Sequence, residues 1–228
     1  MEKFNEQELR LLLVKESNYD LDKAEKMYNF IIGEQPKAVT KSVVNEPKPD
    51  GIYFILNTDT AVHESLATDE DKHNSIAVGV KMGNKFANVA LHNAAYGKKI
   101  PLCQENKVPC GSKQFFHDSF WKAISDWNGE ANTNDMRRAL NPDINLGKYK
   151  YIPSVAQLNL ILLNINEINE ALVEAGGDPM KEDWYWSSTE NSSSTEWYVN
   201  FINNSTSICN KYNDLVVRPA VTCKIQNL

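Results

Sequence analysis

The sequence predicts an α+β protein in which strands are followed by helices and then by strands again. Apolar residues alternate with polar ones within residues 51–91 and again within 184–223, whereas three- and four-residue spacing dominates between these two regions. The chain has 228 residues, of which 42% are hydrophobic and 24% are charged. A chain of this length and composition can bury a sizeable core without disulfide or metal staples.

The chain is predicted to divide into an N-terminal helical segment (residues 1–33), a linker (34–50) and one folded domain (51–228). Helical spacing indicates a hairpin of two helices, Phe4–Lys15 and Leu21–Ile32. The linker contains Pro36, Pro47 and Pro49 among polar residues, which favours a semi-extended spacer. The hairpin could attach the domain to a larger assembly or make it oligomerise.

Within the domain, the elements are predicted in the order of three strands, three helices and three strands. The first two strands precede a Gly83-Asn84 turn that predicts a hairpin with the third. The third helix is expected to begin at Pro153 or after a Ser154 cap, and to end at Gly176-Gly177. We expect the last strand to pair near the first. The predicted ranges are Gly51–Leu56, Ile76–Val80, Lys85–Leu91, Ser112–Asn128, Asn132–Leu140, Pro153–Leu172, Trp184–Ser188, Trp197–Phe201 and Val216–Cys223.

Composition argues against several classes of function. The net charge of −6 disfavours nucleic acid as the main ligand, because proteins that hold phosphate backbones usually carry a basic stripe. No apolar run approaches the ~18 residues that a membrane span needs, so no membrane insertion is expected. The N-terminus lacks the layout of a signal peptide. We therefore expect a cytoplasmic location, with the cell surface as an alternative.

Cysteine and histidine patterns predict neither a metal site nor a disulfide framework. The four cysteines, Cys103, Cys110, Cys209 and Cys223, form no CxxC pair and are expected to be unligated thiols. The four histidines show no HExxH or His-Cys spacing. Common hydrolase, kinase and nucleotide-binding motifs are also absent, so we expect no catalytic residues and no cofactor.

The most informative segment runs from Trp184 to Ala220. Of the 28 residues from Ser187 to Asp214, 16 are Asn, Ser or Thr, and tryptophans interrupt them. Such residues favour turns, which explains the polarity but not the aromatic framing. Small polar residues around rigid aromatic anchors are typical of adaptable recognition surfaces.

The most specific motifs of this region are Tyr185-Trp-Ser-Ser-Thr-Glu190, followed by Trp197 and Val217-Arg-Pro-Ala220. Together with further motifs over about residues 50–222, they resemble a Bacteroides-type family with a C-type-lectin fold related to the formylglycine-generating-enzyme core. The resemblance implies a C-type-lectin-like (formylglycine-generating-enzyme-like) domain. Neither the calcium loop of lectins nor the reactive cysteine pair of the oxidase occurs in the sequence.

Some members of this family are variable proteins of diversity-generating retroelements, in which adenine-directed mutagenesis rewrites a C-terminal segment. The resemblance implies that Asn codons there change to codons for Ser, Thr, Ile, Tyr, Asp or Cys, whereas Lys211 and the tryptophans cannot arise in this way. Trp186, Trp197, Phe201 and Arg218 are expected to be scaffold. The expected ligand-binding surface comprises Asn191, Ser192, Ser194, Thr195, Ile202, Asn203, Ser205, Ser207, Ile208, Cys209, Asn210, Tyr212, Asn213 and Asp214.

Three functions stay open at this point. The first is a binding protein that displays this diversified surface to a protein or glycan target. The resemblance implies that such a protein could be associated with a phage particle. The second is a non-diversified adhesin-like or structural domain of the same fold, in which the polar loops only provide solubility. A sulfatase-modifying type of enzyme is the remote third alternative.

Overall fold

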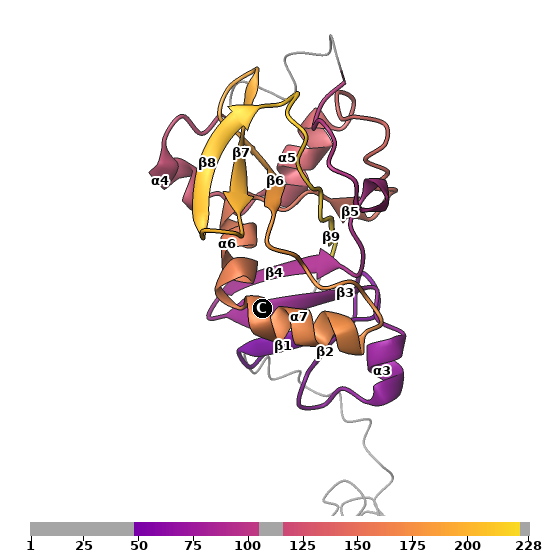
Figure 1. The fold of residues 1–228 in the computed structure, drawn as a ribbon. Helices are drawn as coiled ribbons and strands as arrows, with labels where there is room; N and C mark the ends of the chain where they lie inside the picture. The colour runs from indigo at the N-terminus through magenta and orange to yellow at the C-terminus, as the bar shows by residue number, and fades with distance from the viewer. Residues whose placement is uncertain (1–47, 105–115, 224–228) are drawn as a thin grey trace, which may run out of the picture. The chain divides into compact units, whose positions relative to one another are not determined.

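The computed structural model describes residues 48–104 and 116–223. The predicted N-terminal hairpin, all but the last residues of the linker and the first part of the predicted helix Ser112–Asn128 lie outside these residues. The described part contains helices and antiparallel sheets (Figure 1), which confirms the α+β class.

The first sheet has four strands in the order β2-β1-β3-β4, and all neighbouring strands are antiparallel. Its strands are β1 (Gly51–Ile55), β2 (Ala61–His63), β3 (Ala77–Met82) and β4 (Lys85–Ala90). The predicted hairpin of β3 and β4 is confirmed, and Gly83 has a φ of 58° at its turn. Strand β2 and the short helix α3 (Asp69–His73) were not predicted, although Thr68 and Asp71 form a capping box at the start of α3.

The helices are shorter than the sequence predicts. They are α4 (Phe120–Ile124), α5 (Gly129–Met136), α6 (Val155–Leu163) and α7 (Ile165–Glu174), with a 3₁₀ turn, η1, at Ala95–Gly97. In the predicted helix Ser112–Asn128, the helical turns begin only after the Ser119 cap and end at Ser125. The buried Asp126 then accepts a hydrogen bond from the backbone N–H of Asn128, which turns the chain away from a helical path.

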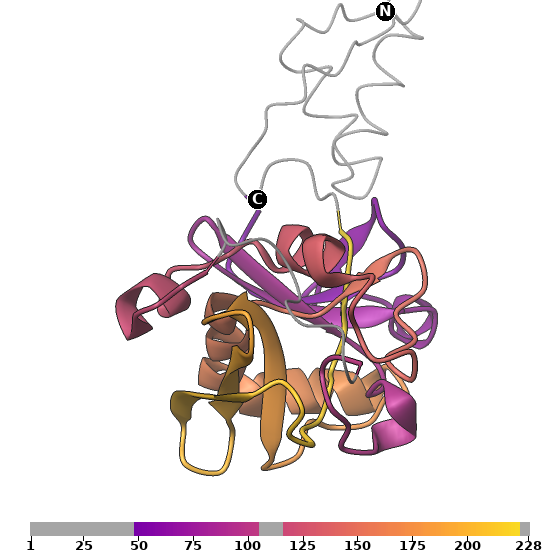
Figure 2. The same cartoon turned by 90° about the horizontal axis from the view of Figure 1, so that it is seen from above.

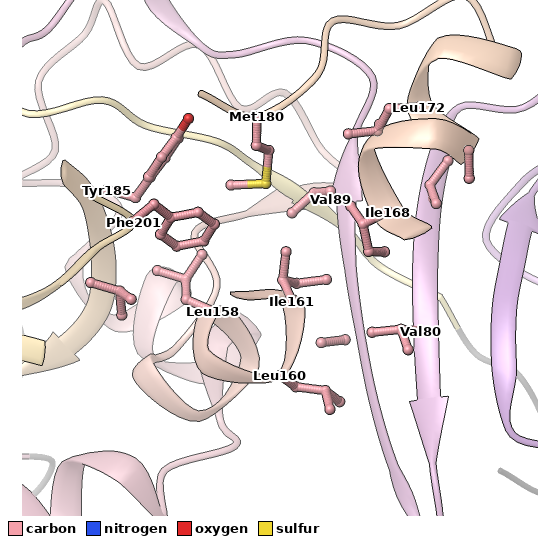
Figure 3. Packing of buried hydrophobic residues seen from close by; sticks show 14 of the residues in the cluster. Val80, Val89, Leu158, Leu160, Ile161, Ile168, Leu172, Met180, Tyr185 and Phe201 are labelled. Atoms are coloured by element: carbon pink, nitrogen blue, oxygen red, sulfur yellow. The ribbon is translucent and has the colours of Figure 1, made fainter. Parts of the chain in front are cut away.

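The predicted third helix is two helices, α6 and α7, that meet at Asn164. Ser154 caps the first one, as one of the two predicted starts requires, and Gly176 ends the second with a φ of 73°. Apolar residues of both helices fill the main core (Figure 3). Leu158 and Ile161 lie between Phe201 on one side and Val80 and Val89 on the other, so the helices join the two larger sheets.

The second sheet has three antiparallel strands in the order β6-β7-β8. Strands β6 (Trp184–Glu190) and β7 (Thr195–Asn200) extend the two predicted strands, whereas β8 (Ser205–Asn210) corrects the prediction of a polar loop. Small polar residues form this strand because its backbone pairs with β7 in a regular register over all six positions. Figure 2 shows this sheet beside the helices from a second direction.

The prediction that the last strand pairs near the first is wrong. The last strand, β9, contains only Ala220–Val221 and pairs with β5 (Lys150–Tyr151) in a sheet of its own. It also runs beside β4, at the opposite edge of the first sheet from β2 and β1. The buried side chain of Asn88 explains this position, because it bonds both backbone groups of Val221 at 2.8 and 3.0 Å.

Candidate functional site

The β6–β8 sheet, its turns and the residues that directly follow β8 carry almost all of the residues that the sequence singles out. Antiparallel pairing places Trp197 opposite Ile208 and Val199 opposite Thr206, so these four side chains share one face. Cys209 lies opposite Glu196 on the other face. The expected surface residues of β8 therefore project alternately to two faces of a strand, rather than in one direction from a loop.

The predicted burial of the two tryptophans is confirmed. Trp186 is completely buried in a second apolar cluster, and its indole N–H donates to the carbonyl of Ile100 at 3.0 Å. Trp197 is 7% exposed and its indole donates to the carbonyl of His117 at 2.8 Å. Each indole thus fills a core and has its polar atom satisfied, as a buried tryptophan requires.

The other two scaffold residues are buried as well. Phe201 packs against Tyr185, with ring centroids 4.7 Å apart. The Arg218 guanidinium donates to the backbone carbonyls of Leu91 and Asp178 at 2.9 and 2.6 Å, and burial lowers its pKa to about 10. Arg218 therefore ties the end of β4 to the loop that precedes β6.

A buried cluster of three charged residues joins β6, β7 and the end of β8. The ammonium group of Lys211 contacts the carboxylate of Glu190 and lies 3.4 Å from Oε2 of Glu196. All three side chains are at most 3% exposed. Burial raises the pKa of both carboxyl groups, and the pKa of Glu196 lies well above its ordinary value. One lysine thus faces two buried carboxyl groups.

Sequence reasoning missed the roles of Glu190 and Glu196 but contained a signal for them. Glu190, Glu196 and Lys211 are the only charged residues between Trp184 and Asn213. Isolated charges in an otherwise uncharged stretch of strands are candidates for burial as a set, because a charge is tolerated in a core only with partners. Lys211 was interpreted as fixed, and its complete burial agrees with that role.

The predicted surface residues of the β6–β7 turn mostly bond to one another. Thr195 Oγ1 donates to Asn191 Oδ1 at 2.9 Å and lies 2.6 Å from the Ser192 hydroxyl, and the Asn191 amide donates to the carbonyl of His117. These three residues are half-buried, and Ser194 is exposed. Of these four residues of the expected surface, three therefore shape the turn.

Most of the remaining predicted residues are exposed, and they gather at the two ends of β8. Ile202 is 58% exposed in the β7–β8 turn beside Asn203, whereas Tyr212 is 39% exposed at the other end with Asn213 and Asp214. The two ends are ~17 Å apart, since each residue of a strand advances the chain by ~3.3 Å. Ile208 lies between them and is 45% exposed.

Cys209 is half-buried and chemically quiet. Burial, together with the carboxyl group of Glu196, raises the pKa of its thiol to about 12, which leaves it almost entirely protonated at neutral pH. Cys103 corrects the prediction of unligated thiols, because it is disulfide-bonded.

A separate cleft of about 860 Å³ lies beside η1 and is lined by residues that the prediction did not include, among them Asn93, Tyr96, Asp143 and Asp178. Among the described residues, no group of three or more His, Cys, Asp or Glu side chains is placed to hold a metal ion. In the same part of the chain, no helix is long and apolar enough to cross a membrane. No protein-family model and no curated protein matches the chain.

Proposed function

We propose that residues 51–228 form a C-type-lectin-type binding domain whose C-terminal segment is diversified to recognise varying targets. One observation carries the proposal. Within a single short segment, Trp186, Trp197 and Lys211, which adenine-directed mutagenesis cannot produce from Asn codons, are buried. Of the 14 residues of the expected surface, which it can produce, nine are exposed and none is buried.

This division supports diversification because a changing surface needs a fold that does not depend on it. The tryptophan hydrogen bonds and the Glu190–Lys211 contact use atoms that lie outside the variable set. Exposed positions on β8 and its turns can then change at little energetic cost, since substitutions away from buried features usually alter stability by less than ~0.5 kcal/mol.

Binding would come from apolar and aromatic anchors surrounded by small polar groups. Ile202, Ile208 and Tyr212 provide partly exposed anchors, and the sheet holds them in place before a target arrives. A surface that is already ordered loses little conformational entropy on binding. The mechanism uses no nucleophile, which agrees with the raised thiol pKa of Cys209.

The hydrogen-bonded turn of Asn191, Ser192 and Thr195 favours the alternative of a non-diversified domain at that one position, because there the polar residues serve local structure. A diversified domain would show sequence variation among isolates at the exposed codons of this segment, whereas a non-diversified domain would not.

Sequencing the locus in many isolates tests the proposal. We expect a neighbouring reverse-transcriptase gene and a near-identical repeat that differs from this gene only at adenines. Codons for exposed residues such as Ile208 and Asn213 should vary among isolates, while those for Trp186 and Lys211 stay constant. Absence of the repeat, or variation spread evenly over buried and exposed codons, would favour the non-diversified domain.

A further inference from the structure

The outer edge of β8 is open in the described part of the chain. Strand β8 pairs with β7 on one side, and no other strand pairs with it. The backbone N–H of Lys211 donates to the carbonyl of Ser194. Because every second residue of an antiparallel strand bonds to the partner strand, this bond shows which residues of β8 bond to β7. It follows that Ser207 and Cys209 bond to β7, whereas the N–H and C=O groups of Thr206 and Ile208 point away from the sheet.

Among the residues that the structure describes, this edge lacks the features that usually protect an exposed strand. Residues Ser205–Asn210 contain no charged residue and no proline, and their register with β7 has no bulge. The outer edge of β4 differs, because the segment from Pro219 to Val221 lies along it and bonds to Asn88 and Ala90. An open, uncharged edge is a template for another extended chain.

An aromatic patch lies next to the open edge, on the face to which Thr206 and Ile208 project. We define this patch as Phe120, Trp121 and Ile208. The ring of Phe120 is 6.5 Å from that of Trp197, the residue opposite Ile208, and 5.6 Å from that of Trp121. Trp121 is 75% exposed, and Phe120 and Ile208 are 44% and 45% exposed. In Figure 1, helix α4 lies on the β8 side of the sheet.

We propose that β8 binds an extended segment of a protein target as an added antiparallel or parallel strand, with every second side chain of that segment on the aromatic patch. The outward backbone groups of Thr206 and Ile208 repeat at the spacing of a strand, so the backbone of an extended polypeptide matches them in both spacing and donor–acceptor order. The exposed charges nearest the patch in sequence, Asp118 and Lys122, pair with each other at 2.6 Å. The fitting segment is therefore uncharged and apolar at alternate positions.

This inference rests on the proposed function and adds a reason why diversification is tolerated there. Main-chain hydrogen bonds do not depend on which side chains β8 carries, and Phe120 and Trp121 lie outside the variable set. Together they would give every variant a constant share of affinity, while the side chains of β8 select the target. Strand addition divides affinity and specificity in this way.

The test uses a displayed library of random twelve-residue peptides selected on the full chain. We expect binders with apolar residues at alternate positions. Thr206→Pro, which removes one outward N–H and keeps the bonds to β7, should weaken a selected peptide by about tenfold or more. Thr206→Val keeps that N–H and the side-chain shape, so it should bind normally. Trp121→Ser should also weaken binding, whereas Leu66→Ser, at an equally exposed residue in the turn between β2 and α3, should not.

Amide hydrogen exchange gives a second readout on the same peptide. In the free protein, the amides of Ser207 and Cys209 should exchange slowly and those of Thr206 and Ile208 quickly. The peptide should slow the exchange of Thr206 and Ile208. A selection that yields no binder, or binders that are indifferent to Thr206→Pro and leave these two amides unprotected, would overturn strand addition. Neither outcome would change the result of sequencing the locus for a template repeat. Failure of strand addition is therefore distinguishable from failure of the proposed function.

Discussion

Strands β7 and β8 lie side by side in one sheet, yet they have opposite characters. Four of the six residues of β7 are buried, including Trp197 and Glu196, whereas none of the six residues of β8 is buried. Composition differs, since β7 carries Trp197, Tyr198 and Val199, whereas four of the six residues of β8 are Ser, Thr or Asn. Position differs as well: β7 lies between two neighbouring strands and contacts two cores, and β8 has a neighbour on one side among the described residues. Framework and candidate binding surface are therefore divided strand by strand.

We expect the largest loss of stability at Trp186 in β6, the strand that pairs with β7 on the side away from β8. Truncation to alanine removes a completely buried indole and its hydrogen bond to Ile100, so Trp186→Ala should lower the free energy of unfolding by ~3–5 kcal/mol. Urea unfolding followed by circular dichroism measures this loss. A change below ~1 kcal/mol would show that the second core does not depend on Trp186.

The charge cluster should be nearly as sensitive. Lys211→Met leaves two buried carboxyl groups without their cation, which typically costs ~3–5 kcal/mol. The exposed Lys98→Met serves as a control and should stay within ~0.5 kcal/mol. Adding Glu190→Gln and Glu196→Gln to Lys211→Met should recover part of the loss in thermal melts. No recovery would mean that packing, rather than charge, explains the effect.

Glu196 should also give the protein a characteristic pH dependence. Its pKa is raised in the folded state, so the folded protein binds more protons than the unfolded chain above the ordinary pKa of 4.5. Stability should therefore fall as the pH rises from about 5 through the raised pKa. Glu196→Gln cannot titrate and should flatten this decline. Urea unfolding at pH 5 to 8 compares the two proteins, and equal slopes would contradict the assignment.

The smallest effects belong to β8. Asn210→Ser changes an exposed side chain that accepts one hydrogen bond, from the backbone N–H of Tyr212, and it should alter stability by less than ~0.5 kcal/mol. Differential scanning calorimetry compares the melting temperatures of this variant and of Trp186→Ala. If both variants melted at the same reduced temperature, the division between framework and surface would be wrong.

Sequence patterns were sufficient where local chemistry alone sets the structure. The β3–β4 hairpin follows from Gly83-Asn84, and α6 begins at Ser154 because its side chain caps the helix. Sequence patterns were insufficient where contacts between residues far apart in the chain determine the structure. Four of the six residues of β8 are Ser, Thr or Asn, which favour turns, and its pairing with β7 makes it a strand. Asn88 draws the last strand to β4 through side-chain bonds that no periodicity reveals.

The candidate site shows the same limit. The aromatic spacing predicted the burial of Trp186 and Trp197, because large apolar residues at fixed intervals in a polar segment need a core. The charged partners of Lys211 could not be assigned, since Glu190 and Glu196 meet it only through strand register. Nor could sequence show that Asn191 and Thr195 bond each other.

Randomisation of the segment tests the central claim most directly. One yeast-displayed library would carry Asn-derived codons at Ile202, Ser207, Ile208, Asn210, Tyr212 and Asn213, and a matched library would carry them at Trp186, Trp197, Glu196 and Lys211. The measured quantity is the fraction of clones that resist protease and can be enriched for binding to a test protein such as lysozyme. A binding surface on an independent framework predicts that most clones of the first library resist protease and that binders emerge from it, while few clones of the second survive. Equal survival in both libraries, or no binder from the first, would contradict the account.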